Sequence, residues 1–334
     1  MSSNSSNFQS EAARFVESFQ RVHKEISKVI VGHDRLIEDV LTGLFAGGHV
    51  LLEGVPGIGK TMLVNTLANA VDCVFSRIQF TPDLMPSDII GTRVVVEDDR
   101  GKKHFHFQQG PVFTQVLLAD EINRATPKAQ SALLEAMQEK SVTVSGQRYV
   151  LDPPFFVLAT QNPLEMEGTY PLPEAQLDRF LFKLIVQFPP FNDLIEVARR
   201  TTQREMPRAG RVLTGQEVVT LMSVIRDVPI AEHVEIYAAK VLYATHPNTE
   251  QTTPMVKQYV KYGASPRGLQ AMVLGGKVRA LLDGRFNVSV EDIRQVARPS
   301  LRHRVLLNFE GEAEEIKTDE IIREILEKTE VEVQ

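Results

Sequence analysis

The sequence contains little that could form covalent cross-links or membrane spans. It has a single cysteine, Cys73, and no tryptophan in 334 residues, so an intrachain disulfide is excluded. No apolar run approaches the roughly 18 residues that a membrane-spanning helix needs. The first eleven residues, MSSNSSNFQSE, have neither the basic nor the apolar region of a secretory signal. We therefore expect a cytoplasmic protein without a membrane span, in a reducing compartment.

A strong excess of one charge is absent from most of the chain. The formal net charge is −6. Residues 309–334 hold ten acidic and three basic residues, a net −7, which leaves +1 for the rest. A nearly neutral body does not favour nucleic acid or an anionic membrane as a partner. We expect residues 309–334 to form an acidic C-terminal tail.

The most informative segment is Gly54-Val55-Pro56-Gly57-Ile58-Gly59-Lys60-Thr61. It fits G-x-x-x-x-G-K-[ST], the phosphate-binding loop of nucleotide triphosphatases. An apolar strand pattern precedes it, and a helical pattern follows from Met62. The pattern predicts that Lys60 contacts the β- and γ-phosphates and that the Thr61 hydroxyl binds Mg²⁺. A glycine-rich turn that merely joins strand to helix is the alternative.

The order of apolar patterns predicts the fold class. Strands alternate with helices as far as Pro190, which is typical of an α/β core with a parallel sheet and helices on both faces. Only helical patterns follow from Asp193 to about Val305. We therefore expect residues 11–190 to form a nucleotide-binding core that carries two inserted hairpins, and residues 191–308 to form a helical domain. Residues 1–10 are rich in Ser and Asn, which predicts disorder.

Two acidic residues end the apolar segment 116–119. Ligands of parallel sheets bind beyond the carboxyl ends of the strands. We therefore predict that Asp120 holds the metal ion and that Glu121 is the general base that polarises the attacking water. Taken alone, such a pair is more often a turn or a helix cap.

Five motifs in order resemble those of a MoxR-type ATPase of the AAA+ superfamily: LLEGVPGIGKT, LLADEINRA, LATQNP, GTYPLPEAQLDRF and SPRG. The resemblance covers about residues 22–308. It implies an AAA+ P-loop core followed by a smaller all-α lid, with ATP and Mg²⁺ as cofactors. It also implies a homo-oligomeric ring, a hexamer, that remodels or matures protein complexes, and a partner with a von Willebrand factor A domain.

The resemblance also implies roles for single residues. Asn162 matches sensor 1, Arg179 matches the arginine finger, and Arg267 matches sensor 2. Val31 and Gly32 match the segment that packs on adenine, and Met62 completes the predicted nucleotide contacts. Simpler roles remain open: Asn162 could cap a turn, and Arg179 could form a surface ion pair.

Other expectations concern the ring and its cargo. Arg179, as the arginine finger, is the first candidate for a contact between subunits, and Arg124 is the second. The two hairpins, residues 88–107 and 141–150, are expected to project into the central channel. Their basic tips, which carry Arg100, Lys102, Lys103 and Arg148, could instead only aid solubility. A nucleic-acid motor and a nucleotide-switched scaffold are the alternative functions.

Overall fold

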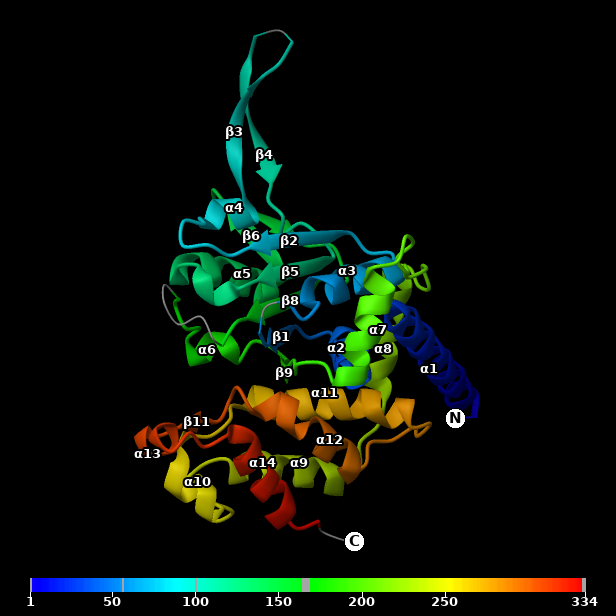
Figure 1. The fold of residues 1–334 in the computed structure, drawn as a ribbon, viewed down its shortest axis with the longest axis vertical. Helices are drawn as coiled ribbons and strands as arrows, with labels where there is room; N and C mark the ends of the chain where they lie inside the picture. The colour runs from blue at the N-terminus through cyan, green and yellow to red at the C-terminus, as the bar shows by residue number, and fades with distance from the viewer. Residues whose placement is uncertain (1, 56, 100, 164–168, 332–334) are drawn as a thin grey trace.

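A five-stranded parallel sheet forms the centre of the molecule. The computed structural model describes residues 2–55, 57–99, 101–163 and 169–331. The strands follow the order β2-β5-β8-β1-β9 (Figure 1), and all neighbours pair in parallel. They are β1 (Val50–Glu53), β2 (Phe75–Gln79), β5 (Val116–Asp120), β8 (Phe156–Gln161) and β9 (Phe182–Ile185). This arrangement confirms the predicted α/β core.

Helices cover both faces of the sheet, which explains why its three central strands, β5, β8 and β1, are almost continuously apolar. Successive side chains point to opposite faces, so Leu51 packs in a different cluster from Val50 and Leu52. The face with Leu51 is covered by α4 (Pro86–Ile90) and α5 (Pro127–Glu139). The opposite face is covered by α1 (Ser2–Val29), α2 (Asp34–Phe45) and α3 (Lys60–Ala70).

Two antiparallel hairpins leave the core, as the sequence predicts, although residues 88–90, predicted in the longer hairpin, belong to α4. The longer one pairs β3 (Gly91–Glu97) with β4 (Lys103–Gln109) and extends far from the body in Figure 1. The shorter one pairs β6 (Ser141–Val144) with β7 (Gln147–Val150). The Phe107 and Tyr149 rings stack with their centroids 4.1 Å apart, so the hairpins support each other at their bases. Arg100, predicted at the longer tip, lies outside the described residues.

The helical region after Pro190 divides differently from the prediction. Helices α7 (Phe191–Thr201) and α8 (Gly215–Asp227) lie beside the core helices in Figure 1, and Arg14 of α1 pairs with Glu217 of α8 at 3.0 Å. The smaller helical unit begins with α9. It comprises α9 (Glu232–Ala244), α10 (Pro254–Tyr259), α11 (Pro266–Leu282), α12 (Val290–Leu301), α13 (Phe309–Ala313) and α14 (Thr318–Lys328). We call this unit the lid. It also contains a short antiparallel pair, β10 (Val260–Tyr262) with β11 (Leu306–Leu307), which the helical patterns do not predict.

Described segments near both chain ends form helices that their composition does not predict. Residues 2–10, expected to be disordered, belong to α1. The Phe8 ring packs against Phe286 with the centroids 6.1 Å apart, which extends the apolar stripe of the helix. Residues 309–328 are not a tail, because Ile321, Ile322 and Ile325 are fully buried. Their helical spacing outweighs the acidic residues around them. No helix in the described ranges is long and apolar enough to cross a membrane.

A buried histidine fixes the start of β1. His49 is 6% exposed, its Nδ1 accepts a hydrogen bond from the Val157 amide, and its Nε2 donates to the Met137 carbonyl. Burial lowers the pKa of His49 to about 4. The neutral ring therefore joins β1, β8 and α5, and a second proton would break one of these bonds.

We predict that the protein loses stability as the pH falls from about 6.5 to 4. The folded pKa of His49 lies below its unfolded value, so the unfolded state binds the extra proton, and stability is complete only above the unfolded pKa. The pKa of buried His303 is also lowered by burial, which adds to the same trend. His49 alone should contribute about 3 kcal/mol across this window.

Chemical denaturation of wild type and His49→Gln across this pH range tests the prediction. For wild type, the free energy of unfolding should fall more steeply with falling pH than for the variant. The difference in slope should be that of one proton, roughly 1.4 kcal/mol per pH unit. His104→Gln, on the exposed hairpin, is the control and should keep the wild-type slope. Identical slopes for wild type and His49→Gln would contradict the role of His49.

Candidate active site

The loop between β1 and α3 adopts the geometry that its glycines predict. Gly57 and Gly59 have φ of +81° and +82°, values that favour glycine. An added Cβ at either position would meet nothing within 4 Å, so the inner side of the loop is open. Lys60 begins α3, and its ammonium donates to the Gly54 carbonyl at 2.7 Å. Pro56, predicted in the same loop, lies outside the described residues.

The two predicted acids are held by the neighbouring strand. Thr160 of β8 is fully buried, and its hydroxyl donates to Asp120 Oδ1 at 2.6 Å. The same hydroxyl accepts from the Glu121 amide at 2.8 Å. Glu121 has a φ of +55°, a conformation that costs energy for a side chain with a Cβ and often marks functional sites. One side chain therefore fixes the carboxylate of one acid and the backbone of the next.

Two residues that the sequence analysis missed contact these acids. Arg77 donates to Asp120 Oδ2 at 2.7 Å, and Gln79 donates to Glu121 Oε2 at 2.7 Å. Both lie near the carboxyl end of β2, two positions apart and therefore on one face. Ile78 between them is buried on the other face. Polar residues alternating with a buried one at the end of a strand were the signal that could have identified them.

A polar cavity of about 610 Å³ brings most of the predicted residues together. Its walls come from the loop, the start of α3 and the carboxyl ends of β2, β5 and β8. The lining residues are Gly57, Gly59, Lys60, Thr61, Met62, Asn65, Arg77, Gln79, Asp120, Glu121 and Asn162. Burial lowers the pKa of Lys60, while the carboxylates of Asp120, Glu121 and Glu53 oppose that shift. The cavity thus combines two cations, Lys60 and Arg77, with two acids and a helix start, a set suited to a polyphosphate with a metal ion.

An apolar pocket of about 250 Å³ continues from this cavity. It shares Gly57, Gly59 and Met62 with the polar cavity, and Val31, predicted to contact adenine, lines it. Its other apolar walls are Val29, Ile30, Ile58, Phe188, Pro189, Leu194 and Val197. A polar cavity that adjoins an apolar pocket matches a ligand with a charged end and a flat ring end.

Gly32 has a steric role beside that pocket. Its φ is +73°, and an added Cβ would lie 2.0 Å from Asp193 Oδ2. Gly32 does not line the pocket and packs closely against the first turn of α7. Its contact with adenine stays a prediction.

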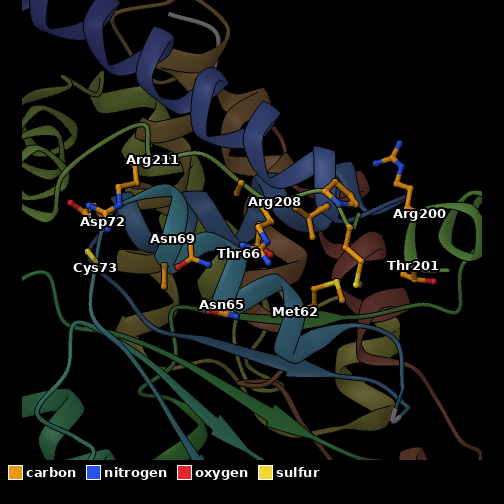
Figure 2. A pocket seen from close by; sticks show the side chains of 15 residues that line it. Met62, Asn65, Thr66, Asn69, Asp72, Cys73, Arg200, Thr201, Arg208 and Arg211 are labelled. Atoms are coloured by element: carbon orange, nitrogen blue, oxygen red, sulfur yellow. Dashed lines mark ion pairs between the residues drawn. The ribbon is translucent and has the colours of Figure 1, made fainter. Parts of the chain in front are cut away.

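A third cavity, of about 600 Å³, lies on the other side of α3. Figure 2 shows Met62, Asn65 and Asn69 of α3 on one side of it and Arg208 on another. Met62 lines this cavity, the polar cavity and the apolar pocket alike. Its side chain therefore stands where the three spaces meet.

The predicted metal ligands, Thr61 and Asp120, line the same polar cavity. Both offer oxygen atoms, which Mg²⁺ prefers. Among the described residues, no cluster of three or more His, Cys, Asp or Glu could hold a metal ion. A Mg²⁺ bound by Thr61 and Asp120 would therefore depend on phosphate and water oxygens for its remaining ligands, as is usual for this ion.

Arg179 follows Asp178 in the chain and Arg267 pairs with Asp178, and neither arginine lines this cavity. Arg179 donates to the Leu134 carbonyl at 2.6 Å and lines a separate cavity of about 580 Å³. The Arg267 guanidinium is 3.6 Å from the Asp178 carboxylate. An anion near Arg267 is expected from its place in the first turn of α11, and Asp178 is such an anion. Arg124 instead stays with the acids and donates to Glu121 at 3.1 Å.

Two family models match the two parts of the chain. The model described as "ATPase family associated with various cellular activities (AAA)" matches residues 49–182. The model described as "AAA lid domain" matches residues 253–325. The second match includes most of α14, in agreement with the buried isoleucines of that helix.

Whole proteins are similar over nearly the full length. Chaperone MoxR1 of Mycobacterium tuberculosis is 42% identical over 93% of this chain and 82% of its own. Protein MoxR of Methylorubrum extorquens is 35% identical over 92% of this chain and 93% of its own. A crystal structure from Cytophaga hutchinsonii, described only as a candidate ATPase, has a TM-score of 0.91 and 42% identity, with 100% of both chains covered.

We predict that Lys60→Ala weakens nucleotide binding by about 10²-fold, because a charged hydrogen-bond donor to the phosphates would be lost. Titration with a fluorescent ATP analogue measures this. Lys128→Ala, on the exposed side of α5, is the matched control and should bind like wild type. Unchanged affinity in Lys60→Ala would rule out the polar cavity as the phosphate site.

Proposed function

Because this chain belongs to the MoxR family of AAA ATPases, we propose that it binds ATP with Mg²⁺ and hydrolyses the terminal phosphoanhydride bond. One observation carries the proposal. Lys60, Thr61, Asp120, Glu121 and Asn162, far apart in sequence, line a single polar cavity. The adjoining apolar pocket gives the adenine ring a place next to the triphosphate.

Each residue at the polar cavity has a proposed role. The Lys60 ammonium and the loop amides bind the β- and γ-phosphates. Thr61 and Asp120 hold Mg²⁺, which neutralises charge on the phosphates when bound. The Asn162 amide hydrogen-bonds the γ-phosphate and the attacking water, which it holds in line.

Glu121 is the proposed general base. Gln79 and Arg124 both donate to its Oε2. Within the described part of the chain these contacts leave Oε1 for the attacking water. Two donors on one oxygen fix the orientation of the carboxylate, so that Oε1 is directed by the protein rather than by the substrate. Proton transfer to Glu121 then accompanies the attack of water on the γ-phosphorus.

We further propose that the protein works as a homo-oligomeric ring, a hexamer. The proposal is supported by the family resemblance and by the fact that Arg179 and Lys60 of one subunit line different cavities. An arginine away from the nucleotide site of its own subunit would act on the nucleotide of a neighbouring subunit. A guanidinium in that position can neutralise charge that develops on the γ-phosphate. Arg267, next to Asp178, belongs to the same surface and is proposed to act beside it.

The proposed task of the ring is to remodel or mature protein complexes, with the hairpins acting on the client. A relative of this chain carries the name chaperone. The exposed pair Val95 and Phe105, directly opposite each other on the longer hairpin, offers apolar surface to a polypeptide. A partner with a von Willebrand factor A domain is proposed from the family resemblance alone. The near-neutral body makes a nucleic-acid motor the weaker candidate.

We predict that Glu121→Gln hydrolyses ATP at least ~10²-fold more slowly, the usual size of a general-base effect, with little change in ATP affinity. Steady-state phosphate release and ATP titration measure the two quantities. Glu232→Gln, on the exposed surface of α9, is the control and should match wild type. A Glu121→Gln variant with normal turnover would exclude Glu121 as the base.

We predict that Arg179→Ala binds ATP but hydrolyses it about 10³–10⁵-fold more slowly, the range for an arginine supplied in trans. Mixing this variant with Lys60→Ala should restore part of the activity, since some interfaces then join an intact loop to an intact Arg179. Arg199→Ala, whose side chain is 70% exposed on α7, is the control. If the subunits exchange and the mixture stays inactive, Arg179 does not act in trans, and Arg124 becomes the residue to test.

A further inference from the structure

Three consecutive lid residues after α12 hold the segment that carries Arg179. Arg302 donates to the Lys183 carbonyl at 3.1 Å. His303 Nε2 lies 3.1 Å from the Phe180 carbonyl and donates to it. The Phe180 carbonyl lies just before β9, and the Lys183 carbonyl lies within β9. The lid therefore donates hydrogen bonds to backbone carbonyls of this core segment.

The third of these residues, Arg304, makes the most contacts. Its side chain is 2% exposed, and its Nε donates to Asp178 Oδ1 at 2.8 Å. Its Nη2 donates to the carbonyls of Asp178 at 2.9 Å and Phe180 at 2.6 Å. Its Nη1 donates to the Leu181 carbonyl at 3.2 Å and also to the Ser300 carbonyl. One planar guanidinium thus binds the residues on both sides of Arg179.

The Arg179 segment has little other structure to fix it on one side. The preceding helix, α6 (Glu174–Leu177), has only four residues, and none of them is buried. The Phe180 ring is fully buried in the core and anchors the other side. Ser265 Oγ also donates to the Asp178 carboxylate at 2.7 Å, and the Arg179 guanidinium is held by the Leu134 carbonyl. Among the described residues, Arg304 alone holds Asp178 through both its carboxylate and its carbonyl, so the direction in which Arg179 leaves the backbone depends on Arg304 as well.

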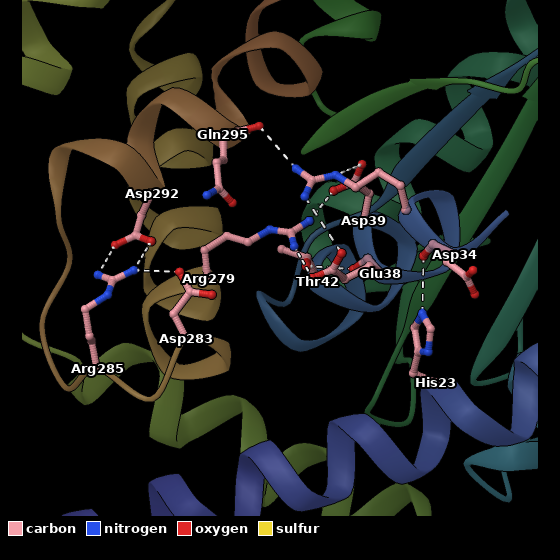
Figure 3. Close-up of polar contacts among 11 residues, drawn as sticks. His23, Asp34, Glu38, Asp39, Thr42, Arg279, Asp283, Arg285, Asp292 and Gln295 are labelled. Carbon is pink, nitrogen blue, oxygen red and sulfur yellow. Dashed lines mark hydrogen bonds and ion pairs between the residues drawn. The ribbon is translucent and has the colours of Figure 1, made fainter.

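The lid that supplies Arg304 is itself fixed to the core by a second buried ion cluster. Arg279 of α11, whose side chain is 4% exposed, pairs with Asp39 of α2 at 2.5 Å and also with Glu38 (Figure 3). Helix α2 directly follows His33, which lines the apolar pocket. The lid thus has one attachment on α2, the helix that follows the apolar pocket residue His33, and another at the Arg179 segment.

We propose that Arg304 is a positioning residue for Arg179, through which the lid of one subunit sets the geometry of the arginine offered to its neighbour. This inference rests on the proposed action of Arg179 in trans. Arg304 touches neither the polar cavity nor the apolar pocket. Its effect should therefore appear in the turnover of the neighbouring subunit and not in the ATP affinity of its own.

Mixed rings test this by placing the Arg304 change in one kind of subunit at a time. The reference mixture combines Lys60→Ala subunits, which lack the loop lysine but offer Arg179, with Arg179→Ala subunits, which bind ATP. Arg304→Lys keeps the charge but loses the planar fork that reaches several carbonyls at once. When Arg304→Lys is added to the Lys60→Ala subunits, kcat of the mixture should fall about 10- to 10²-fold, as expected for a misplaced catalytic group. KM for ATP should not change. In the Arg179→Ala subunits the same change should leave turnover at the reference value.

Controls separate positioning from folding. Arg298→Lys, on the exposed face of α12, goes into the Lys60→Ala subunits and should have no effect. Thermal unfolding and subunit exchange are measured for every variant. If Arg304→Lys fails to fold, Asp178→Asn replaces it, because it weakens the same pair from the other side and should give the same asymmetry.

The outcomes are distinct. Loss of turnover only when the change is in the Arg179-donating subunit supports the inference. Equal loss in both arms, loss only in the ATP-binding subunit, or no loss in either arm overturns it. An inactive reference mixture would instead overturn the action of Arg179 in trans, and this inference with it, and so is told apart from a failure of Arg304 alone.

Discussion

The parallel pairing of β8 between β5 and β1 is the constraint on which the candidate site depends. The register sets Glu53 beside Gln161 and Ala119 beside Ala159. The three chain segments that leave these strands therefore begin at the same edge of the sheet. This register brings the buried Thr160 hydroxyl next to the two acids, where it hydrogen-bonds the Asp120 carboxylate and the Glu121 amide and so fixes their positions. A shift of one residue in β8 would point Thr160 to the other face and separate the acids from the loop.

Much of the core could be predicted from the sequence because its physics is local. The strands at 50–53 and 116–120 are short apolar runs, and the phosphate loop is a contiguous motif with a fixed backbone requirement. Arg77 and Gln79 could not be assigned in this way, since their importance comes from the pairing of β2 with β5, which no local pattern specifies. At the C-terminus, the acidic composition predicted an exposed tail. Ile321 and its neighbours are buried there because they pack against the rest of the lid, which composition does not specify.

The site residues also divide into two groups that no motif separates. Lys60 and Asp120 line one cavity, whereas Arg179 lines another. The sequence order shows only that all three match one family. The structure adds the separation, and the separation is the physical reason to expect a second subunit. It also shows where the lid is attached to the core, with Arg279 held by α2 and Arg304 holding Asp178.

The central claim is that one subunit binds the nucleotide and the next supplies Arg179. A structure of the assembled protein with Mg²⁺ and a non-hydrolysable ATP analogue tests it most directly. We predict the triphosphate between Lys60 and Asp120 of one subunit, with the Arg179 guanidinium of its neighbour about 3 Å from the γ-phosphate. A nucleotide bound outside the polar cavity, or a γ-phosphate contacted by Arg179 of its own subunit, would contradict the account.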